Sequence, residues 1–148
     1  MTVERSTSRV DSPIDPSCRS LVVVCPSWVG DTVMATPVLR ALRQHRPEMR
    51  ITGIMRPGLS EVLAGCPWLD AMIEVNNRGL FGPSRAARAI RQTGADVAML
   101  LPNSFRSALS VRLSHIGRRI GYARDGRTRL LTHSIRPQAG GPIAMIEY

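Results

Sequence analysis

The sequence predicts an α/β domain, a Rossmann-like parallel sheet with helices on both faces. Short apolar runs rich in β-branched residues alternate along the chain with segments whose apolar residues recur at helical spacing. The first run, Leu21-Val22-Val23-Val24, is continuously apolar, as expected of a strand buried on both sides. With 148 residues, 43% of them hydrophobic and 21% charged, the chain has the length and composition of one globular domain.

The elements of the first part of the chain begin with a strand over residues 20–25. Helical spacing then runs over residues 33–45, with the arginines facing away from the apolar positions. Pro37 falls inside this pattern. Either the first turn is kinked, or the regular helix begins at Pro37 with Thr36 as its cap. A second apolar run predicts a strand over residues 50–55.

The rest of the chain continues the same alternation. An Arg- and Ala-rich stretch over residues 83–93 predicts a helix that ends at Gly94. The remaining expected elements are a short helix over residues 59–64, a strand over 71–75, a strand over 97–101, a helix over 104–115, and short strands over 119–122 and 130–135.

The ends of the chain differ in composition from its centre. Residues 1–19 are polar, contain Pro13 and Pro16, and lack the apolar centre of a signal peptide, so we expect a flexible extension before a domain over residues 20–140. The three cysteines have no metal-ligand spacing, and no apolar run approaches the roughly 20 residues of a membrane span. Reduced thiols, a cytoplasmic location and no bound metal are therefore expected.

The charge of the chain first suggests an anionic partner. All 20 basic residues are arginine and 11 residues are acidic, which gives a formal net charge of +9. The arginines are scattered rather than clustered, and only 4% of the residues are aromatic, so a stacking surface for bases is not expected. We therefore predict solvated arginines and no nucleic-acid partner. A steep salt dependence of oligonucleotide binding would reverse that prediction.

Polar side chains follow the expected strands in three loops, residues 27–31, 56–60 and 102–106. Ligands of parallel sheets bind beyond the carboxyl ends of the strands. If the first and fourth strands are central neighbours, one crevice would contain a carboxylate, an amide, a hydroxyl and a guanidinium group, which suit recognition and deprotonation of a sugar hydroxyl. These groups belong to Asp31, Asn103, Ser104 and Arg106.

Each of these residues also has a purely structural interpretation. Asp is a preferred helix N-cap, so capping and catalysis are equally supported for Asp31. Ser104 precedes a helix and is better explained as a cap. Asn103 fits an ordinary turn and Arg106 a solvated side chain. Gly30 would supply a permissive backbone where the chain turns.

Trp28 lies in the first loop of this aromatic-poor chain. It either fills a gap in the core or offers a flat apolar wall to a ligand, and the core is favoured. The sequence has no GxGxxG after the first strand, no P-loop, no CxxC pair and no HExxH. The residues by themselves predict an α/β domain with a crevice that holds one candidate base.

Two motifs resemble those of one family. Pro26-Ser27-Trp28-Val29-Gly30-Asp31 follows the first strand, and Leu101-Pro102-Asn103-Ser104-Phe105-Arg106-Ser107-Ala108-Leu109 follows the fourth. Together they resemble the N-terminal half of the ADP-heptose:lipopolysaccharide heptosyltransferases of the heptosyltransferase II type, family 9 of the glycosyltransferases. The resemblance runs from about residue 21 to residue 148.

The resemblance implies the N-terminal, acceptor-side domain of a GT-B glycosyltransferase. In that family a second half holds ADP-heptose, and the sugar is transferred to the inner core of lipopolysaccharide by a single inverting displacement, with no metal or other cofactor required. The motif aspartate falls on Asp31, which would be the general base on the acceptor hydroxyl. The anionic acceptor would be bound by Ser27, Gly30, Arg56, Asn103, Ser104, Arg106 and Arg124.

The length of the chain departs from the family pattern. Residues 141–148 would begin the connection to a donor domain, and a base without a donor site loses the gain from positioning two substrates, so we expect the chain to be inactive alone. The implied partners are a lipid-linked inner-core oligosaccharide, ADP-heptose only together with a second domain, and the inner face of the inner membrane through peripheral contact. The alternative is a non-catalytic sugar- or nucleotide-binding α/β module, and a nucleic-acid-binding domain is less well supported.

Overall fold

The computed structural model describes residues 14–124 and 126–136. They form one sheet of six strands in the order β3-β2-β1-β4-β5-β6, and every neighbouring pair is parallel. The strands are β1 (Ser20–Val24), β2 (Arg50–Met55), β3 (Ala71–Glu74), β4 (Val97–Leu100), β5 (Arg118–Tyr122) and β6 (His133–Ile135). The helices are α1 (Val29–Met34), α2 (Thr36–His45), α3 (Gly82–Gln92) and α4 (Phe105–Leu113), with short 3-10 turns η1 (Ser60–Leu63) and η2 (Arg127–Leu130).

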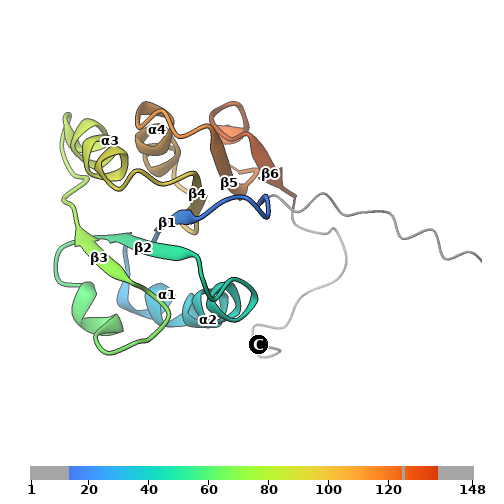
Figure 1. Ribbon diagram of the computed structural model, residues 1–148. Helices are drawn as coiled ribbons and strands as arrows, with labels where there is room; N and C mark the ends of the chain where they lie inside the picture. The colour runs from blue at the N-terminus through green and yellow to red at the C-terminus, as the bar shows by residue number, and fades with distance from the viewer. Residues whose placement is uncertain (1–13, 125, 137–148) are drawn as a thin grey trace, which may run out of the picture.

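The sheet separates two layers of helices. Helices α3 and α4 cover one face, and α1 and α2 cover the other (Figure 1). The adjacent residues Val22 and Val23 of β1 are both fully buried because they point to opposite faces. Val22 packs in the cluster that contains Ile90 of α3, and Val23 packs in the cluster that contains Leu39 of α2. The predicted fold class is confirmed.

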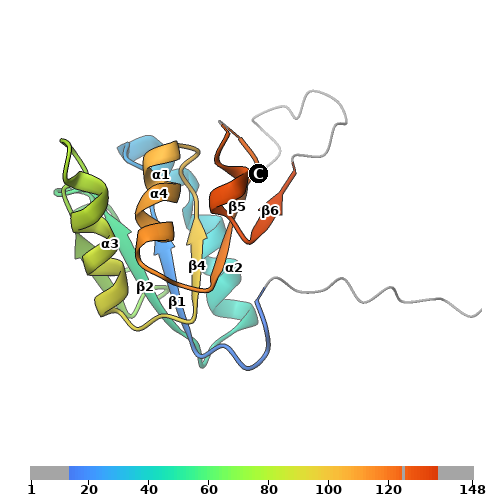
Figure 2. The same ribbon diagram turned by 90° about the horizontal axis from the view of Figure 1, so that it is seen from above.

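The strand order reverses at the centre of the sheet. β1 pairs with β2 on one side, in register Leu21 to Ile51, and with β4 on the other, in register Leu21 to Val97. All the strands end at the same edge (Figure 2). The carboxyl ends of β1 and β4 therefore form the topological switch point, where open α/β sheets bind their ligands.

The helix predicted over residues 33–45 is instead two helices. α1 begins four residues earlier than expected, and α2 starts at Thr36 with Ala35 as its N-cap. Pro37 is the physical cause, because it has no N–H to donate to the carbonyl of Val33 one turn earlier. That carbonyl accepts from the Thr36 hydroxyl over 2.7 Å instead. Thr36 is therefore not the cap of α2. Of the two alternatives, the helix that begins at Pro37 with Thr36 as its cap was wrong, and an irregular first turn agrees with the break at Ala35.

The other elements agree with the sequence to within one or two residues at most ends. The helix over residues 83–93 is α3, and Gly94 follows it with φ +64°, the left-handed conformation that ends helices. The short helix over residues 59–64 is the 3-10 turn η1. No helix in the described part of the chain is long and apolar enough to cross a membrane.

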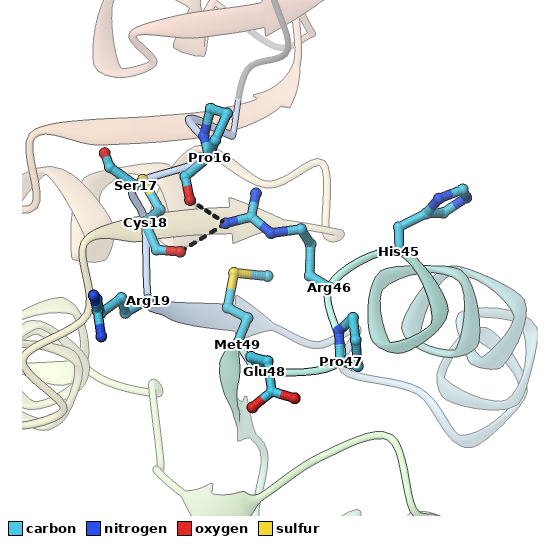
Figure 3. A pocket seen from close by; sticks show the side chains of 9 residues that line it. All are labelled: Pro16, Ser17, Cys18, Arg19, His45, Arg46, Pro47, Glu48 and Met49. Carbon is cyan, nitrogen blue, oxygen red and sulfur yellow. Dashed lines mark hydrogen bonds between the residues drawn. The ribbon is translucent and has the colours of Figure 1, made fainter.

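The described end of the expected N-terminal extension contacts the domain. The Arg46 guanidinium points at the carbonyls of Pro16 and Cys18 and donates to them over 3.2 and 2.7 Å (Figure 3). A cleft of about 710 Å³ lies here, at the amino edge of the sheet, away from the polar loops. Residues 1–13 and the predicted connection over residues 141–148 lie outside the described residues, and the predicted domain boundaries stay predictions.

Candidate functional site

A small cavity lies where the loops after β1, β2 and β4 meet, at the switch point of the sheet. Its volume is about 60 Å³. A water molecule takes up about 30 Å³ of liquid, so the cavity has room for about two waters and not for a sugar ring. Its lining combines strand ends, loops and the helices α3 and α4: Val24, Cys25, Ser27, Ile54, Met55, Arg56, Val75, Asn77, Ala86, Ile90, Pro102, Ser104, Ser107 and Ser110.

Asp31 lies in the first turn of α1 and does not cap it. The N-cap is Trp28, and no side chain caps this helix. The backbone carbonyl of Asp31 accepts from the N–H of Ala35 over 3.0 Å, whereas its carboxylate is exposed and accepts no hydrogen bond from the residues that the structure describes. The capping interpretation of Asp31 is therefore wrong, and its carboxylate is available to a ligand.

The turn between β1 and α1 is fixed by a buried hydroxyl. Thr32 is fully buried, and its hydroxyl donates to the carbonyl of Trp28 over 2.8 Å. This turn leaves the Trp28 side chain 71% exposed, so the prediction that it fills the core was wrong. Gly30 lies in the helix, and a Cβ there would meet nothing within 4 Å, so the backbone does not require glycine at this position.

Arg56 brings the loop after β2 against the loop after β1. It is half-buried, and one of its terminal nitrogens donates to the carbonyl of Ser27 over 3.4 Å. Both residues line the cavity. The remaining N–H groups of Arg56 are therefore positioned at the edge of the cavity, where a carboxylate or phosphate would gain charge-assisted hydrogen bonds.

Ser104 caps α4, as the sequence indicated. Its hydroxyl oxygen accepts from the N–H of Ser107 over 3.3 Å, and the Ser107 hydroxyl donates back to the Ser104 carbonyl over 2.8 Å. Asn103 is exposed beside it. The cap fixes the loop after β4, and both Ser104 and Ser107 line the cavity.

Arg127 holds the loop after β4 through hydrogen bonds from its guanidinium group. It is fully buried, and its Nε donates to the carbonyl of Tyr122 over 2.9 Å. One terminal nitrogen donates to the carbonyls of Pro102 and Ser104, and the other donates to Asn103 Oδ1 over 3.3 Å. One guanidinium therefore joins the loop after β4 to the end of β5 and sets the orientation of the Asn103 amide.

Arg106 is exposed, as expected of a solvated arginine, and it also holds the loop between β3 and α3. One terminal nitrogen donates to the carbonyls of Asn77 and Gly79 over 2.7 and 2.6 Å. Gly82 permits this contact, because a Cβ there would lie 2.2 Å from the Asn77 carbonyl oxygen and 2.9 Å from that nitrogen of Arg106.

Asn77, one of the residues that line the cavity, contains an unpaired side-chain oxygen. Its Oδ1 is buried and has no hydrogen-bond partner in the described structure, although the residue as a whole is half-buried and lines the cavity. Leaving such a group without a partner costs about 1–3 kcal/mol. A donor from a water or a ligand at this point would remove that cost.

Two further residues limit what the site can do. Burial raises the pKa of the Cys25 thiol to about 12, so this residue of the cavity wall is a neutral thiol and not a nucleophile at ordinary pH. Arg124 is exposed after β5 and does not line the cavity. Across the described residues, no cluster of three or more His, Cys, Asp or Glu side chains could hold a metal ion.

Comparisons of the sequence and of the structure with known proteins both find similarity to heptosyltransferases. A sequence model described as "Glycosyltransferase family 9 (heptosyltransferase)" matches residues 84–145. "Lipopolysaccharide heptosyltransferase 2" of Salmonella typhimurium is 33% identical over 122 residues, which cover 75% of this chain and 33% of that protein. The enzyme of the same name from Escherichia coli is 32% identical over 122 residues, which also cover 75% of this chain and 33% of that protein.

Solved structures agree with these sequence relatives. "Structure of E. coli ADP-heptose lps heptosyltransferase II" superposes with TM-score 0.67 and 28% identity, covering 76% of this chain and 33% of that one. A family 9 glycosyltransferase from Veillonella parvula superposes with TM-score 0.75 and 23% identity over 83% of this chain and 37% of that one, which shows the shared fold.

The resemblance to the family 9 glycosyltransferases is confirmed. The chain spans about one third of the length of the curated relatives it matches, since 33% of each of them is covered.

The structure brings together some of the residues predicted to bind the acceptor, and not others. Ser27, Arg56 and Ser104 line one cavity. Asn103 lies in the same loop as Ser104 and accepts from Arg127, and Arg106 donates to the carbonyl of Asn77, which lines the cavity. Gly30 and Asp31 lie on α1, directly after the loop that contains Ser27. Arg124 stands apart from this group, and its proposed contact with an acceptor gains no support from the cavity.

Two residues of the site were missed from the sequence. Arg127 is one of 20 basic residues, all arginine, and nothing in its spacing separated it from the exposed ones. Asn77 lies in a loop between two elements, where asparagine is ordinary. Polar side chains were expected in the loops that follow three of the strands. Only the same reasoning, applied to the loop after β3, could have included Asn77.

Proposed function

We propose that this chain is the acceptor-side domain of a heptosyltransferase that binds a lipid-linked inner-core oligosaccharide of lipopolysaccharide. The single observation that carries the proposal is the Asp31 carboxylate, which is exposed in the first turn of the helix after β1 and accepts no hydrogen bond from the described residues. The relatives of the chain are heptosyltransferases. The proposed acceptor ligands are Ser27, Gly30, Arg56, Asn103, Ser104, Arg106 and, with the least support, Arg124.

The size of the cavity constrains how an acceptor would bind. With about 60 Å³ it admits a hydroxyl or a charged substituent but no sugar ring. The ring would rest on the loops outside, with one substituent reaching the polar groups of Arg56 and Asn77. Arginine recognises carboxylates and phosphates with several N–H groups at once, which suits an anionic core sugar.

In the proposed reaction Asp31 accepts the proton of the acceptor hydroxyl. The oxygen then attacks the anomeric carbon of ADP-heptose while the bond to ADP breaks, so ADP leaves with the bonding electrons and the configuration inverts. The solved E. coli relative is an ADP-heptose heptosyltransferase, which supports ADP-heptose as the donor. The donor would need a second, donor-binding domain, and without it these residues alone would not transfer heptose.

The proposed acceptor implies that the domain works at a membrane. A lipid-linked oligosaccharide is anchored in a bilayer, so the domain would work in peripheral contact with the inner face of the inner membrane. No cofactor is required for the proposed displacement.

The test is a pair of calorimetric titrations of the 148-residue chain, one with a delipidated heptosyl-Kdo oligosaccharide and one with ADP-heptose. We expect binding of the oligosaccharide and none of ADP-heptose. Arg56→Gln should weaken oligosaccharide binding by about tenfold, because a charge-assisted hydrogen bond is lost. The matched control is Arg40→Gln, an exposed arginine of α2, which should bind like the parent.

Binding of ADP-heptose instead of the oligosaccharide would mean that the two halves of the enzyme have been assigned the wrong way round. Binding of neither would favour a module with other ligands. The role of Asp31 is read in a chain that joins this domain to a donor-binding domain. There Asp31→Asn should lower kcat by about 10²–10⁴-fold and leave KM nearly unchanged.

A further inference from the structure

The loop between β3 and α3 presents two large apolar side chains to solvent. Leu80 is 88% exposed and Phe81 is 69% exposed. Isolated exposed apolar residues are common on protein surfaces, but these two are consecutive and stand at the N-terminal end of α3. Figure 2 shows this end of α3 standing out at the carboxyl edge of the sheet. We call Leu80 and Phe81 the apolar tip.

The loop is held in place rather than left loose. Arg85 donates to the carbonyls of Asn76 and Arg78 over 3.3 and 2.7 Å. Arg106 donates to two other carbonyls of the same loop. Because charge-assisted bonds from two helices fix its backbone, the exposure of the apolar tip is built into the fold.

Exposed arginines lie on both sides of the apolar tip in the sequence. They are Arg78 in the loop and Arg85 and Arg88 in the first two turns of α3, and we call them the basic collar. The sequence has no acidic residue between Glu74 and Asp96. An anionic lipid surface attracts basic residues and takes up apolar side chains just below its headgroups.

We propose that the apolar tip inserts into an anionic phospholipid surface while the basic collar contacts the lipid phosphates. The inference deepens the proposed function and rests on it, because a lipid-linked acceptor requires the domain to approach a bilayer. The new element is the surface of the domain that contacts the bilayer, namely the apolar tip and the basic collar. Phe105, the first residue of α4, is a further exposed apolar side chain, at 48%.

The test is co-sedimentation of the 148-residue chain with two kinds of vesicle, one of phosphatidylcholine alone and one of equimolar phosphatidylcholine and phosphatidylglycerol. Neither contains an acceptor, so the outcome does not depend on oligosaccharide binding. We expect the chain to bind the anionic vesicles and to be released by salt, because the attraction of the basic collar is screened.

Variants locate the binding surface. The double change Leu80→Asn with Phe81→Asn should reduce partitioning onto anionic vesicles at least about tenfold, because two apolar side chains are lost from the bilayer contact. The double change Leu80→Ile with Phe81→Leu keeps the apolar character and should bind like the parent. The matched control is Leu113→Asn, 39% exposed at the far end of α4, which should have no effect.

Charge is tested separately from apolar contact. Arg88→Gln should weaken binding to anionic vesicles by about fivefold and leave binding to neutral vesicles unchanged. Arg40→Gln, exposed on α2, is the control and should change neither.

Three results would overturn the proposal: no binding of the parent to anionic vesicles, equal binding by the parent and the double asparagine variant, or self-association of the chain that only this variant abolishes. The last would make the tip a protein interface. Loss of oligosaccharide binding with intact vesicle binding would count against the proposed function and not against this surface.

Discussion

A buried arginine fixes the amide of Asn103: a terminal nitrogen of Arg127 donates to Asn103 Oδ1 over 3.3 Å. The same guanidinium donates to the carbonyls of Pro102, Ser104 and Tyr122. Since Ser104 also caps α4, one side chain sets both the start of a helix and the orientation of a proposed acceptor ligand. Stability and binding are therefore coupled at this point of the fold.

Replacement of Arg127 should expose that coupling. Arg127→Met removes the donor to the carbonyls of Pro102, Ser104 and Tyr122, so the free energy of unfolding should fall by about 2–4 kcal/mol. The measurement is urea unfolding at neutral pH. Arg129→Met, an exposed arginine on the same turn, is the control and should change the value by no more than about 0.5 kcal/mol. Equal losses in both variants would contradict the role of Arg127.

Replacement of Asn77, unlike that of Arg127, should weaken binding without lowering stability. Asn77→Leu removes the unpaired buried oxygen, so the free energy of unfolding should stay the same or rise by about 1 kcal/mol. Oligosaccharide affinity should fall in the same variant. Asn77→Asp keeps the shape but adds a charge to the cavity, and it should destabilise the protein. A clear loss of stability in Asn77→Leu would show that the oxygen has a structural partner.

Two glycines should respond in opposite directions to the same change. Gly82→Ala places a methyl group 2.2 Å from the Asn77 carbonyl, and the free energy of unfolding should fall by about 1–3 kcal/mol. Gly30→Ala meets nothing within 4 Å and should gain about 0.5–1 kcal/mol from better helix propensity. Thermal unfolding of the two variants side by side measures both, and a destabilised Gly30→Ala would mean that the backbone of α1 needs glycine.

Acid should weaken the protein partly through Asp96. The N–H of Arg19 and the hydroxyl and N–H of Ser20 donate to its carboxylate, and they hold its pKa below the ordinary 3.8. A carboxyl with a lowered pKa in the folded state stabilises the protein above its unfolded pKa, and this contribution is lost as the pH falls through the folded value. Below about pH 3.8 the unfolding free energy of the parent should therefore fall more steeply than that of Asp96→Asn. Parallel pH curves for the two proteins would refute this.

The fold could be predicted from the sequence because its central strands are apolar on both faces. Leu21-Val22-Val23-Val24 has only one structural interpretation at that length, and the glycines that end helices mark element boundaries directly. The error lay at Pro37, where a periodic pattern continued across a break. Periodicity reports which side of a helix is apolar, and it does not report whether the backbone hydrogen bonds are continuous.

The site was predicted less completely, for a physical reason. Residues at strand ends, such as Ser27 and Ser104, could be expected to meet because parallel strands end at one edge. Burial of a charged residue depends on what surrounds it in space, and the sequence around Arg127 contains no trace of that. The choice between capping and a free carboxylate for Asp31 depended on whether the helix begins at Val29 or later, a shift of a few residues that propensities do not resolve.

The position of β1 at the centre of the sheet has a consequence for synthesis. The strand made first pairs with β2 soon after, but its other neighbour is β4, whose Val97 lies opposite Leu21. During translation the backbone edge of β1 that pairs with β4 stays unpaired until β4 has left the ribosome. Such late, long-range pairing folds slowly and exposes the nascent chain to aggregation. Yield on expression should therefore depend on chaperones that bind short valine-rich segments.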